Sequence, residues 1–352
     1  MKETSSWSDK ADRAFKGLLD NFWNDNIGMF NNQYPNIDNY SNLTFHYWWY
    51  AHSIDSLVDA FERTRNHQIL EIIREKYLGI VLRNGGQPLN LLYDDMEWLA
   101  LTLLRVYKIT NDPFYLNEVK VLWTDIKKGW TDEAGGGFAW HKEIMHYKNT
   151  PANAPAIILA SRLYQLFDDE NDLDWANKIF KWQDTQLVNQ NTGFVNDGKN
   201  SQKDGAIDTS AYTYCQGVYI GACTELFKIS KNREYIEKAL LTAETTIEKF
   251  THTETGLLVS EGVGDGGLFK GILIRYLTEL VCLLPQETKF ITDFIRKNAE
   301  GLWNEGIEKP HILFNDNWGK APEIKKGISL SVQLSGLFLT ESMAKLEELN
   351  II

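Results

Sequence analysis

The feature of this sequence that most limits its fold is a repeat of apolar helical segments. Residues that are apolar at positions i, i+3, i+4 and i+7 mark about a dozen helices, and alternating strand patterns are almost absent. The helices fall into pairs whose second members begin at intervals of roughly 50 to 60 residues. These second members lie at 46–64, 94–110, 152–167, 212–230, 269–284 and 329–348.

The two members of each pair differ in how their apolar residues are distributed. The second members are apolar on most faces, which is typical of helices buried on all sides, whereas the first members, such as 232–250 and 288–303, have one charged face. Six inner and six outer helices predict an all-α protein with an (α/α)6 toroid. No Pro- or Ser-rich linker interrupts the series, so residues 1–352 are expected to form a single domain. An open solenoid is the alternative, but it would normally carry polar capping repeats.

Charge and cysteine usage exclude several partners. The net charge of -12 argues against nucleic acid and anionic membranes, because phosphate binding needs clustered Lys and Arg. Three cysteines form no disulfide framework, and no segment supplies the roughly 18 consecutive apolar residues of a spanning helix. The N-terminus contains no apolar core of a signal peptide, so we expect a cytoplasmic protein.

The links from outer to inner helices are long and rich in Gly, Trp and Asn, whereas the links back are short. Long loops carry function more often than short ones, so the functional end is expected where the inner helices begin. The candidates at this end are Trp48, Trp49, Asp94, Asp95, Asn153, Tyr214, Gln216 and Lys270.

Two pairs of adjacent aspartates have opposite positions on their helices. Asp94 and Asp95 precede an inner helix and could cap it, with Glu97 as in a capping box. They would also place two carboxylates in an aromatic-rich end, which favours a catalytic role over a cap. Asp168 and Asp169 follow an inner helix and are expected to form a solvated turn.

The segments "WWYAHSIDSLVDAF", "YDDMEWLALTLLRVYKIT", "NAPAIILASRLY", "YTYCQGVYIGA" and "LFKGILIRYL" resemble, in order, the signatures of glycoside hydrolase family 76, the endo-α-1,6-mannanases. The aspartate pair followed three residues later by Trp98 is the most specific of these marks. The resemblance implies an (α/α)6 fold and hydrolysis of α-1,6-mannosidic linkages with retention. It also implies that Asp94 is the nucleophile and Asp95 the general acid/base, with an oligosaccharide or polysaccharide as substrate and no cofactor.

Retaining hydrolysis suits two adjacent acids. It needs carboxyl groups about 5 to 5.5 Å apart, one ionised and one protonated. Two close carboxylates do not both ionise easily, so one pKa is expected to rise. The residues themselves do not show which acid holds the proton, and that assignment comes from the family.

Other residues are weaker candidates for substrate contacts. Asn153, Gln216 and Lys270 could bind sugar hydroxyls, and His141 and Asp38 are further loop candidates. At Cys215 the family usually has Asn, so a hydrogen bond is expected to be lost there. Sugar-stacking rings could come from an aromatic set in which inner packing is the commoner role: Trp48, Trp49, Tyr93, Trp98, Trp140, Tyr212 and Tyr214.

Metal-dependent functions fit the sequence less well, and other sugar-related functions remain open. A zinc site is disfavoured because Cys215 and Cys223 lie eight positions apart without a C-x2-C pattern or a nearby His, so no metal is expected. A magnesium–diphosphate site lacks its third carboxylate, since Trp98 stands in that position. A sugar epimerase of the same architecture, another glycosidase, or a carbohydrate-binding protein without activity remain as alternatives.

Overall fold

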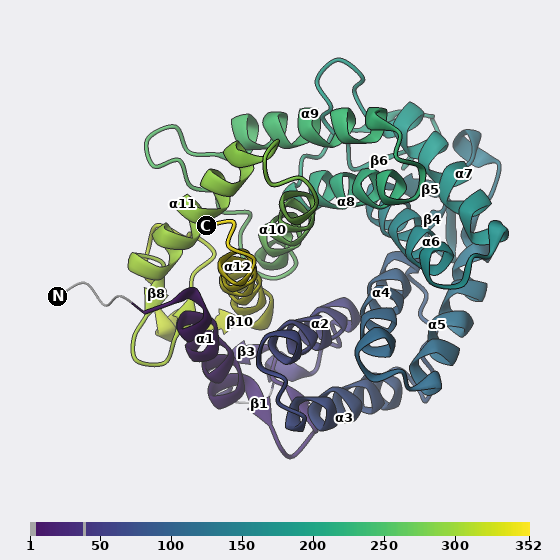
Figure 1. The fold of residues 1–352 in the computed structure, drawn as a ribbon. Helices are drawn as coiled ribbons and strands as arrows, with labels where there is room; N and C mark the ends of the chain where they lie inside the picture. The colour runs from purple at the N-terminus through teal and green to yellow at the C-terminus, as the bar shows by residue number, and fades with distance from the viewer. Residues whose placement is uncertain (1–4, 38–39) are drawn as a thin grey trace. The chain divides into compact units, whose positions relative to one another are not determined.

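The computed structural model describes residues 5–37 and 40–352, in which twelve α-helices dominate (Figure 1). The chain forms two compact units. Unit 1 comprises Met1–Gln87 and Phe250–Ile352, and unit 2 comprises Pro88–Lys249. The expectation of a single domain stays a prediction.

Unit 1 is built around α12, which packs against α1, α2, α10 and α11. Its helices are α1 (Trp7–Phe22), α2 (Tyr47–Thr64), α3 (Gln68–Arg83), α10 (Gly266–Leu283), α11 (Lys289–Asn304) and α12 (Leu330–Glu348).

Unit 2 is built around α6, which packs against α4, α7 and α8. Its helices are α4 (Tyr93–Thr110), α5 (Pro113–Ile126), α6 (Ala154–Phe167), α7 (Glu170–Leu187), α8 (Thr213–Ser230) and α9, whose last residue already belongs to unit 1 (Arg233–Phe250).

Burial separates the inner helices from the outer ones. In α12, 16 of 19 residues are buried, whereas in α1 only 5 of 16 are buried. The apolar stripe of α1 includes Ala11, Leu18 and Phe22, and its first turn is closed by a capping box between Ser6 and Asp9. The six inner helices therefore lie where the repeat predicts them.

Most short links from inner to outer helices share one backbone feature, a C-cap residue in the left-handed conformation. Four inner helices end at a C-cap residue in the left-handed conformation, and the next helix begins within three residues. None of these residues is glycine, so each carries a steric cost of roughly 1 kcal/mol. The residues are Arg65, Asn111, Asp168 and Lys231. Asp168 thus ends α6, while Asp169 caps α7 by accepting a hydrogen bond from the Asn171 backbone N–H at 3.0 Å.

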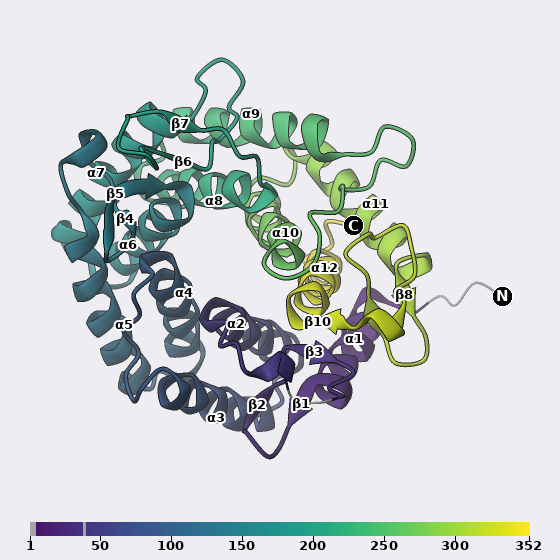
Figure 2. The same cartoon turned by 180° about the vertical axis from the view of Figure 1, so that it is seen from behind.

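The long links contain short strands that were not predicted from the sequence. Unit 2 holds a four-stranded antiparallel sheet in the order β4-β5-β6-β7 (Figure 2). Its strands are β4 (Ala139–His141), β5 (Ile144–Asn149), β6 (Gly198–Lys199) and β7 (Ile207–Asp208). Unit 1 holds three two-stranded pairs formed by β1 (Trp23–Asn24), β2 (Met29–Phe30), β3 (Gln33–Tyr34), β8 (Ile307–Glu308), β9 (Leu313–Phe314) and β10 (Ile328–Ser329).

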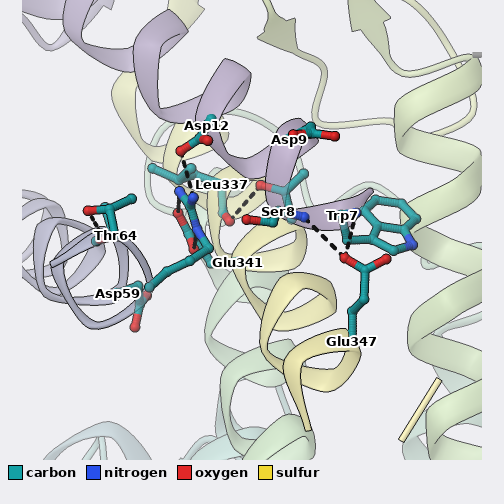
Figure 3. A network of polar contacts seen from close by, with 12 residues as sticks. Trp7, Ser8, Asp9, Asp12, Asp59, Thr64, Leu337, Glu341 and Glu347 are labelled. Atoms are coloured by element: carbon teal, nitrogen blue, oxygen red, sulfur yellow. Dashed lines mark hydrogen bonds and ion pairs between the residues drawn. The ribbon is translucent and has the colours of Figure 1, made fainter. Parts of the chain in front are cut away.

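A polar network ties three helices of unit 1 together. Arg63 of α2 donates hydrogen bonds to Glu341 of α12 at 2.8 and 2.9 Å and to Asp12 of α1 at 2.6 Å. Figure 3 shows Glu347 beside the start of α1, where its carboxylate accepts bonds from the backbone N–H groups of Trp7 and Ser8. Because Glu341 is buried, this pairing with Arg63 compensates its carboxylate for the loss of water.

Among the described residues, none of the helices has the length and apolar character needed to cross a membrane.

Candidate active site

The aspartate pair lies inside the first turn of α4 and does not cap the helix. Leu92 is the N-cap residue and makes no side-chain capping bond. Asp94 and Asp95 are the second and third helical residues, where negative charge still benefits from the helix dipole. Their side chains are therefore available for other contacts.

Both oxygens of Asp94 face hydrogen-bond donors. The Asp95 backbone N–H donates to Oδ1 at 2.9 Å, and the Trp140 indole Nε1–H donates to Oδ2 at 3.1 Å. Trp140 comes from β4, so the sheet fixes the orientation of a carboxylate on the helix. Asp94 is half-buried as a residue.

Asp95 is more deeply buried, with 6% of its surface exposed. Its Oδ2 accepts a hydrogen bond from the side-chain Nδ2 of Asn90 at 2.6 Å. The carbonyl oxygen of the Asn90 amide accepts the Leu91 backbone N–H at 2.6 Å, which turns the NH₂ group toward Asp95. Asn90 was not among the predicted site residues, although its position four residues before the pair is a local signal.

A third carboxylate, Asp197, lies beside the pair and was also missed. It precedes β6, and only 8% of its surface is exposed. Its oxygens accept hydrogen bonds from the Tyr147 hydroxyl at 2.8 Å and from the Cys215 thiol at 3.4 Å. A Cβ at Gly198 would lie 2.6 Å from the Tyr147 oxygen, so a larger residue there would displace the tyrosine.

Cys215 makes a contact of its own, and the expected loss of the hydrogen bond that Asn would make stays a prediction. The structure shows that the buried thiol donates a weak hydrogen bond to Asp197.

The electrostatics of the site favour a proton shared near neutral pH. Burial raises the pKa of the Asp94 carboxyl to about 7, and the nearby charge of Asp197 acts in the same direction. The hydrogen bonds from Asp95 and Trp140 oppose this shift because they favour the ionised form. Burial also raises the pKa of Asp197. The rise at Asp94 is caused mainly by burial, so the expected effect of repulsion between the two aspartates stays a prediction.

Glu97 lies one helical turn after Asp94 and is fully buried. Neither of its carboxyl oxygens makes a hydrogen bond that satisfies normal geometry within the described part of the chain. Burial and the charge of Asp94 raise its pKa well above the ordinary range, which favours the protonated form of Glu97. It does not form the capping box that its position suggested.

Two predicted aromatic residues border the carboxylates. Trp140 donates to Asp94, and its ring packs edge-on against Tyr147 with centroids 6.1 Å apart. Tyr214, at the start of α8, is half-buried and lies in the field of Asp197 and Asp94, which adds to the effect of burial in raising its pKa. A contact of either ring with a ligand stays a prediction.

The other predicted residues of α4 lie deeper. Tyr93 and Trp98 are each 3% exposed and pack inside unit 2.

The loop candidates belong to segments outside α4. Tyr212 is half-buried beside Tyr214, and the His141 ring nitrogen Nδ1 accepts a hydrogen bond from the Glu143 backbone N–H. Asp38 lies outside the described residues.

Asn153 and Gln216 hold loops in place with their amide groups. Asn153 accepts the Phe138 N–H at 2.7 Å and donates to the Phe138 carbonyl at 3.0 Å. Gln216 bonds the N–H and carbonyl of Val195 in the same way, at 2.9 and 2.7 Å. Both side chains are fully buried. The structure gives them a task in loop positioning, and direct contact with a sugar stays a prediction.

The remaining candidates belong to unit 1. Trp48 and Trp49, in the first turn of α2, both donate hydrogen bonds to Asp265. Lys270 of α10 is 1% exposed, and its ammonium donates to the Asp316 carbonyl. Burial lowers the pKa of Lys270 to about 8. A contact between Lys270 and a sugar also stays a prediction.

Comparisons with known proteins agree on the family. The sequence pattern of glycosyl hydrolase family 76 matches residues 6–349. Mannan endo-1,6-alpha-mannosidase DCW1 of Candida glabrata is 22% identical over 316 residues, covering 80% of this chain and 67% of that protein. The chain spans about two thirds of the length of such yeast relatives.

Solved structures are similar over nearly the whole chain. The Lin0763 protein of Listeria innocua is 39% identical with a TM-score of 0.92, and 98% of each chain is covered. The GH76A alpha-1,6-mannanase of Salegentibacter sp. HEL1_6 is 36% identical with a TM-score of 0.91, covering 97% of this chain and 100% of that one. An inactive variant of that mannanase, with two consecutive aspartates replaced, is in complex with alpha-1,6-mannotetrose.

The shared fold confirms the (α/α)6 class predicted from the repeat. With the family pattern matched from residue 6 to residue 349, the chain belongs to glycosyl hydrolase family 76, a family of glycoside hydrolases.

Proposed function

We propose that this protein hydrolyses α-1,6-mannosidic linkages with retention, using Asp94 as nucleophile and Asp95 as general acid/base. The observation that carries the proposal is the adjacency of the two carboxyl groups in the first turn of α4, each oriented by its own donor. The replaced aspartates in the inactive Salegentibacter mannanase are also adjacent, and that protein is in complex with an α-1,6-mannoside.

In the first step, the Asp94 carboxylate attacks the anomeric carbon while the glycosidic C–O bond breaks. Asp95 transfers its proton to the departing oxygen, and a mannosyl ester forms on Asp94. The bond from Asn90 to Oδ2 of Asp95 favours a proton on the other oxygen, Oδ1. The donors on Asp94 orient the nucleophile and favour its ionised form, which opposes the effect of burial.

In the second step, the Asp95 carboxylate takes a proton from water, and the water oxygen attacks the anomeric carbon. The ester bond breaks and Asp94 leaves as a carboxylate, so two inversions give net retention. The pair must carry one proton and one negative charge at the start of this cycle. The rise of the Asp94 pKa to about 7, which burial causes, supports a pair that retains one proton up to near neutral pH.

Proton NMR of the first-formed product tests the stereochemistry. A linkage-defined panel of α-mannobioses and longer oligosaccharides should be cleaved at α-1,6 bonds and should yield the α anomer before mutarotation. Asp95→Gly should be partly rescued by azide with an aryl α-mannoside, because azide replaces the deglycosylating water without needing a base. A first-formed β anomer would overturn the retaining mechanism and would make Asp197 the next candidate for the base.

Mutants test the assignment of residues. Asp94→Asn and Asp95→Asn should each lower hydrolysis at least about a thousandfold, since each removes a transition-state interaction. Asp168→Asn serves as the matched control, because Asp168 lies in the turn that ends α6. The proposal fails if the wild-type protein binds α-1,6-mannosides without cleaving them, which would favour a carbohydrate-binding protein.

A further inference from the structure

Unit 1 contains a cluster in which two indoles share one carboxylate oxygen. Trp48 and Trp49 are adjacent residues at the start of α2, and Asp265 directly precedes α10. The Nε1–H groups of the two indoles donate to Oδ1 of Asp265 at 3.1 and 2.8 Å. Convergence of two large donors on one oxygen fixes the carboxylate far more tightly than a single surface bond would.

Helix capping does not explain Asp265. An aspartate before a helix normally has an extended backbone and accepts N–H bonds from the first turn. Asp265 instead has φ -61° and ψ -42°, and its side chain makes no capping bond to α10. The residue is exposed, and its Oδ2 has no hydrogen-bond partner in residues 5–37 and 40–352. A fixed carboxylate therefore presents one charged oxygen to solvent.

The two tryptophans of the cluster differ in exposure, because Trp49 is buried and Trp48 is half-buried. Trp49 is 3% exposed and stacks on His46, with ring centroids 3.7 Å apart and planes at 6°. Trp48 is half-buried, and contacts with Phe269 and His52 hold its ring in place. Because its N–H already donates to Asp265, the part of the Trp48 ring that remains exposed is apolar.

An apolar face beside an oriented acceptor matches the surface of a hexopyranose. A sugar ring offers C–H groups on one side and hydroxyl donors at its rim, so it can cover Trp48 while its hydroxyls donate to Oδ2. A phosphate or carboxylate ligand would be repelled by the same oxygen and by the net charge of -12. The rigidity of the cluster limits the entropy lost on binding.

We propose that Trp48 and Asp265 form a mannose-binding site in unit 1, outside the unit that holds the aspartate pair. Trp49 and His46 act as positioning residues that hold Asp265 in place. The choice of mannose as the hexose rests on the proposed function. The site adds affinity for α-1,6-linked mannooligosaccharides and takes no part in bond cleavage.

Calorimetric titration of an Asp94→Asn, Asp95→Asn double variant with α-1,6-mannotetraose tests this site without turnover. Adding Asp265→Asn keeps an acceptor for the indoles but removes the charged oxygen, and should weaken binding about tenfold to a hundredfold. Adding Trp48→Ala should weaken binding to a similar extent.

Asp25→Asn is the matched control, because Asp25 accepts an indole bond from Trp23 at 2.7 Å on the same unit without a second tryptophan. It should change the affinity less than about twofold. Trp48→Phe, which keeps a ring, should retain more affinity than Trp48→Ala, and this graded response separates ligand contact from simple loss of folding.

Unchanged affinity for mannotetraose after Asp265→Asn, or an equal loss in the Asp25→Asn control, would overturn the inference. The proposed function is judged separately, by whether the wild-type protein cleaves the same tetraose. If the tetraose is cleaved but Asp265→Asn has no effect on binding, only the unit 1 site is wrong. If it is not cleaved but Asp265→Asn weakens binding, only the hydrolase assignment is wrong.

Discussion

Replacing Asp94 with asparagine should abolish catalysis and stabilise the fold at the same time. Burial raises the pKa of this carboxyl from 3.8 to about 7, with a further contribution from Asp197. Between about pH 4 and pH 7 the folded protein therefore binds more protons at this site than the unfolded chain. The free energy of unfolding should fall as the pH rises through this window, and the asparagine variant should lack this contribution.

The size of the effect follows from the shift. A rise from 3.8 to about 7 corresponds to a ceiling of about 4 kcal/mol at pH 8. Partial exposure of Asp94 screens part of this energy, and the bonds from the Asp95 N–H and Trp140 Nε1–H are weaker to a neutral amide. We expect Asp94→Asn to gain about 1 to 3 kcal/mol at pH 8 and almost nothing at pH 4.

Urea denaturation of both proteins at pH 4, 6 and 8, together with initial rates, provides the measurement. Asp168→Asn should change neither the rate nor the stability by more than about 0.5 kcal/mol. A variant that is less stable than wild type at pH 8, or more stable by the same amount at every pH, would refute the electrostatic reasoning. Retained activity would refute the role of Asp94.

Four further outcomes can be measured. Glu97→Gln should leave the pH profile of kcat/KM unshifted, because burial raises the pKa of this carboxyl well above the ordinary range and favours its neutral form. Lys76→Met should raise the free energy of unfolding at pH 7 by about 1 to 3 kcal/mol, with the gain shrinking toward pH 10, because the buried Lys76 ammonium lacks a hydrogen-bond partner among the described residues and burial lowers its pKa. Gln216→Ala should lower the free energy of unfolding by about 2 to 3 kcal/mol and speed proteolysis of the loop around Val195, whose N–H and carbonyl lose their partner. Hydrolysis should continue unchanged in a chelator, because both proposed steps use carboxyl groups alone.

The helices could be predicted because burial follows the helical period directly. The inner helix predicted at 94–110 is observed at Tyr93–Thr110, and the one predicted at 212–230 is observed at Thr213–Ser230. The start of α10 was placed three residues late, at Phe269 instead of Gly266, because Gly266 and Gly267 have low helix propensity. Most strands were missed because two or three residues between turns show no alternation of side chains, and the six residues of β5 do not alternate between buried and exposed positions.

The candidate site was only partly predictable. Asp94 and Asp95 are adjacent, so their chemistry can be inferred from a single segment. Tyr147 and Asp197 lie 50 positions apart and meet only because β5 pairs with β6. No local sequence pattern predicts such a contact. Asn90 was nearer, but a lone asparagine before a helix is more often part of a turn.

The polar residues at the starts of the inner helices differ in how much donor and acceptor capacity their hydrogen bonds leave for a ligand. Gln216 is fully buried and uses its carbonyl and its NH₂ group on loop backbone, which favours a loop-positioning role over a contact with a sugar. The sequence suggests a sugar contact for such an amide because it does not reveal that a buried loop needs those same groups.

Asp94 and Asp265 differ from these amides because a carboxylate has more acceptor capacity than its observed donors fill. Each oxygen of Asp94 takes one donor, and Asp265 takes two donors on Oδ1 and none on Oδ2 within the described chain. Each residue also retains exposed surface. Remaining acceptor capacity at an exposed, rigidly held oxygen is therefore the property that separates ligand-binding candidates from loop-positioning residues at these helix starts. It favours the same experiment at both places: an Asp-to-Asn change, which keeps the shape and removes the charge, should cost function at Asp94 and Asp265 and cost little at Asp25, whose indole bond lies outside the two sites.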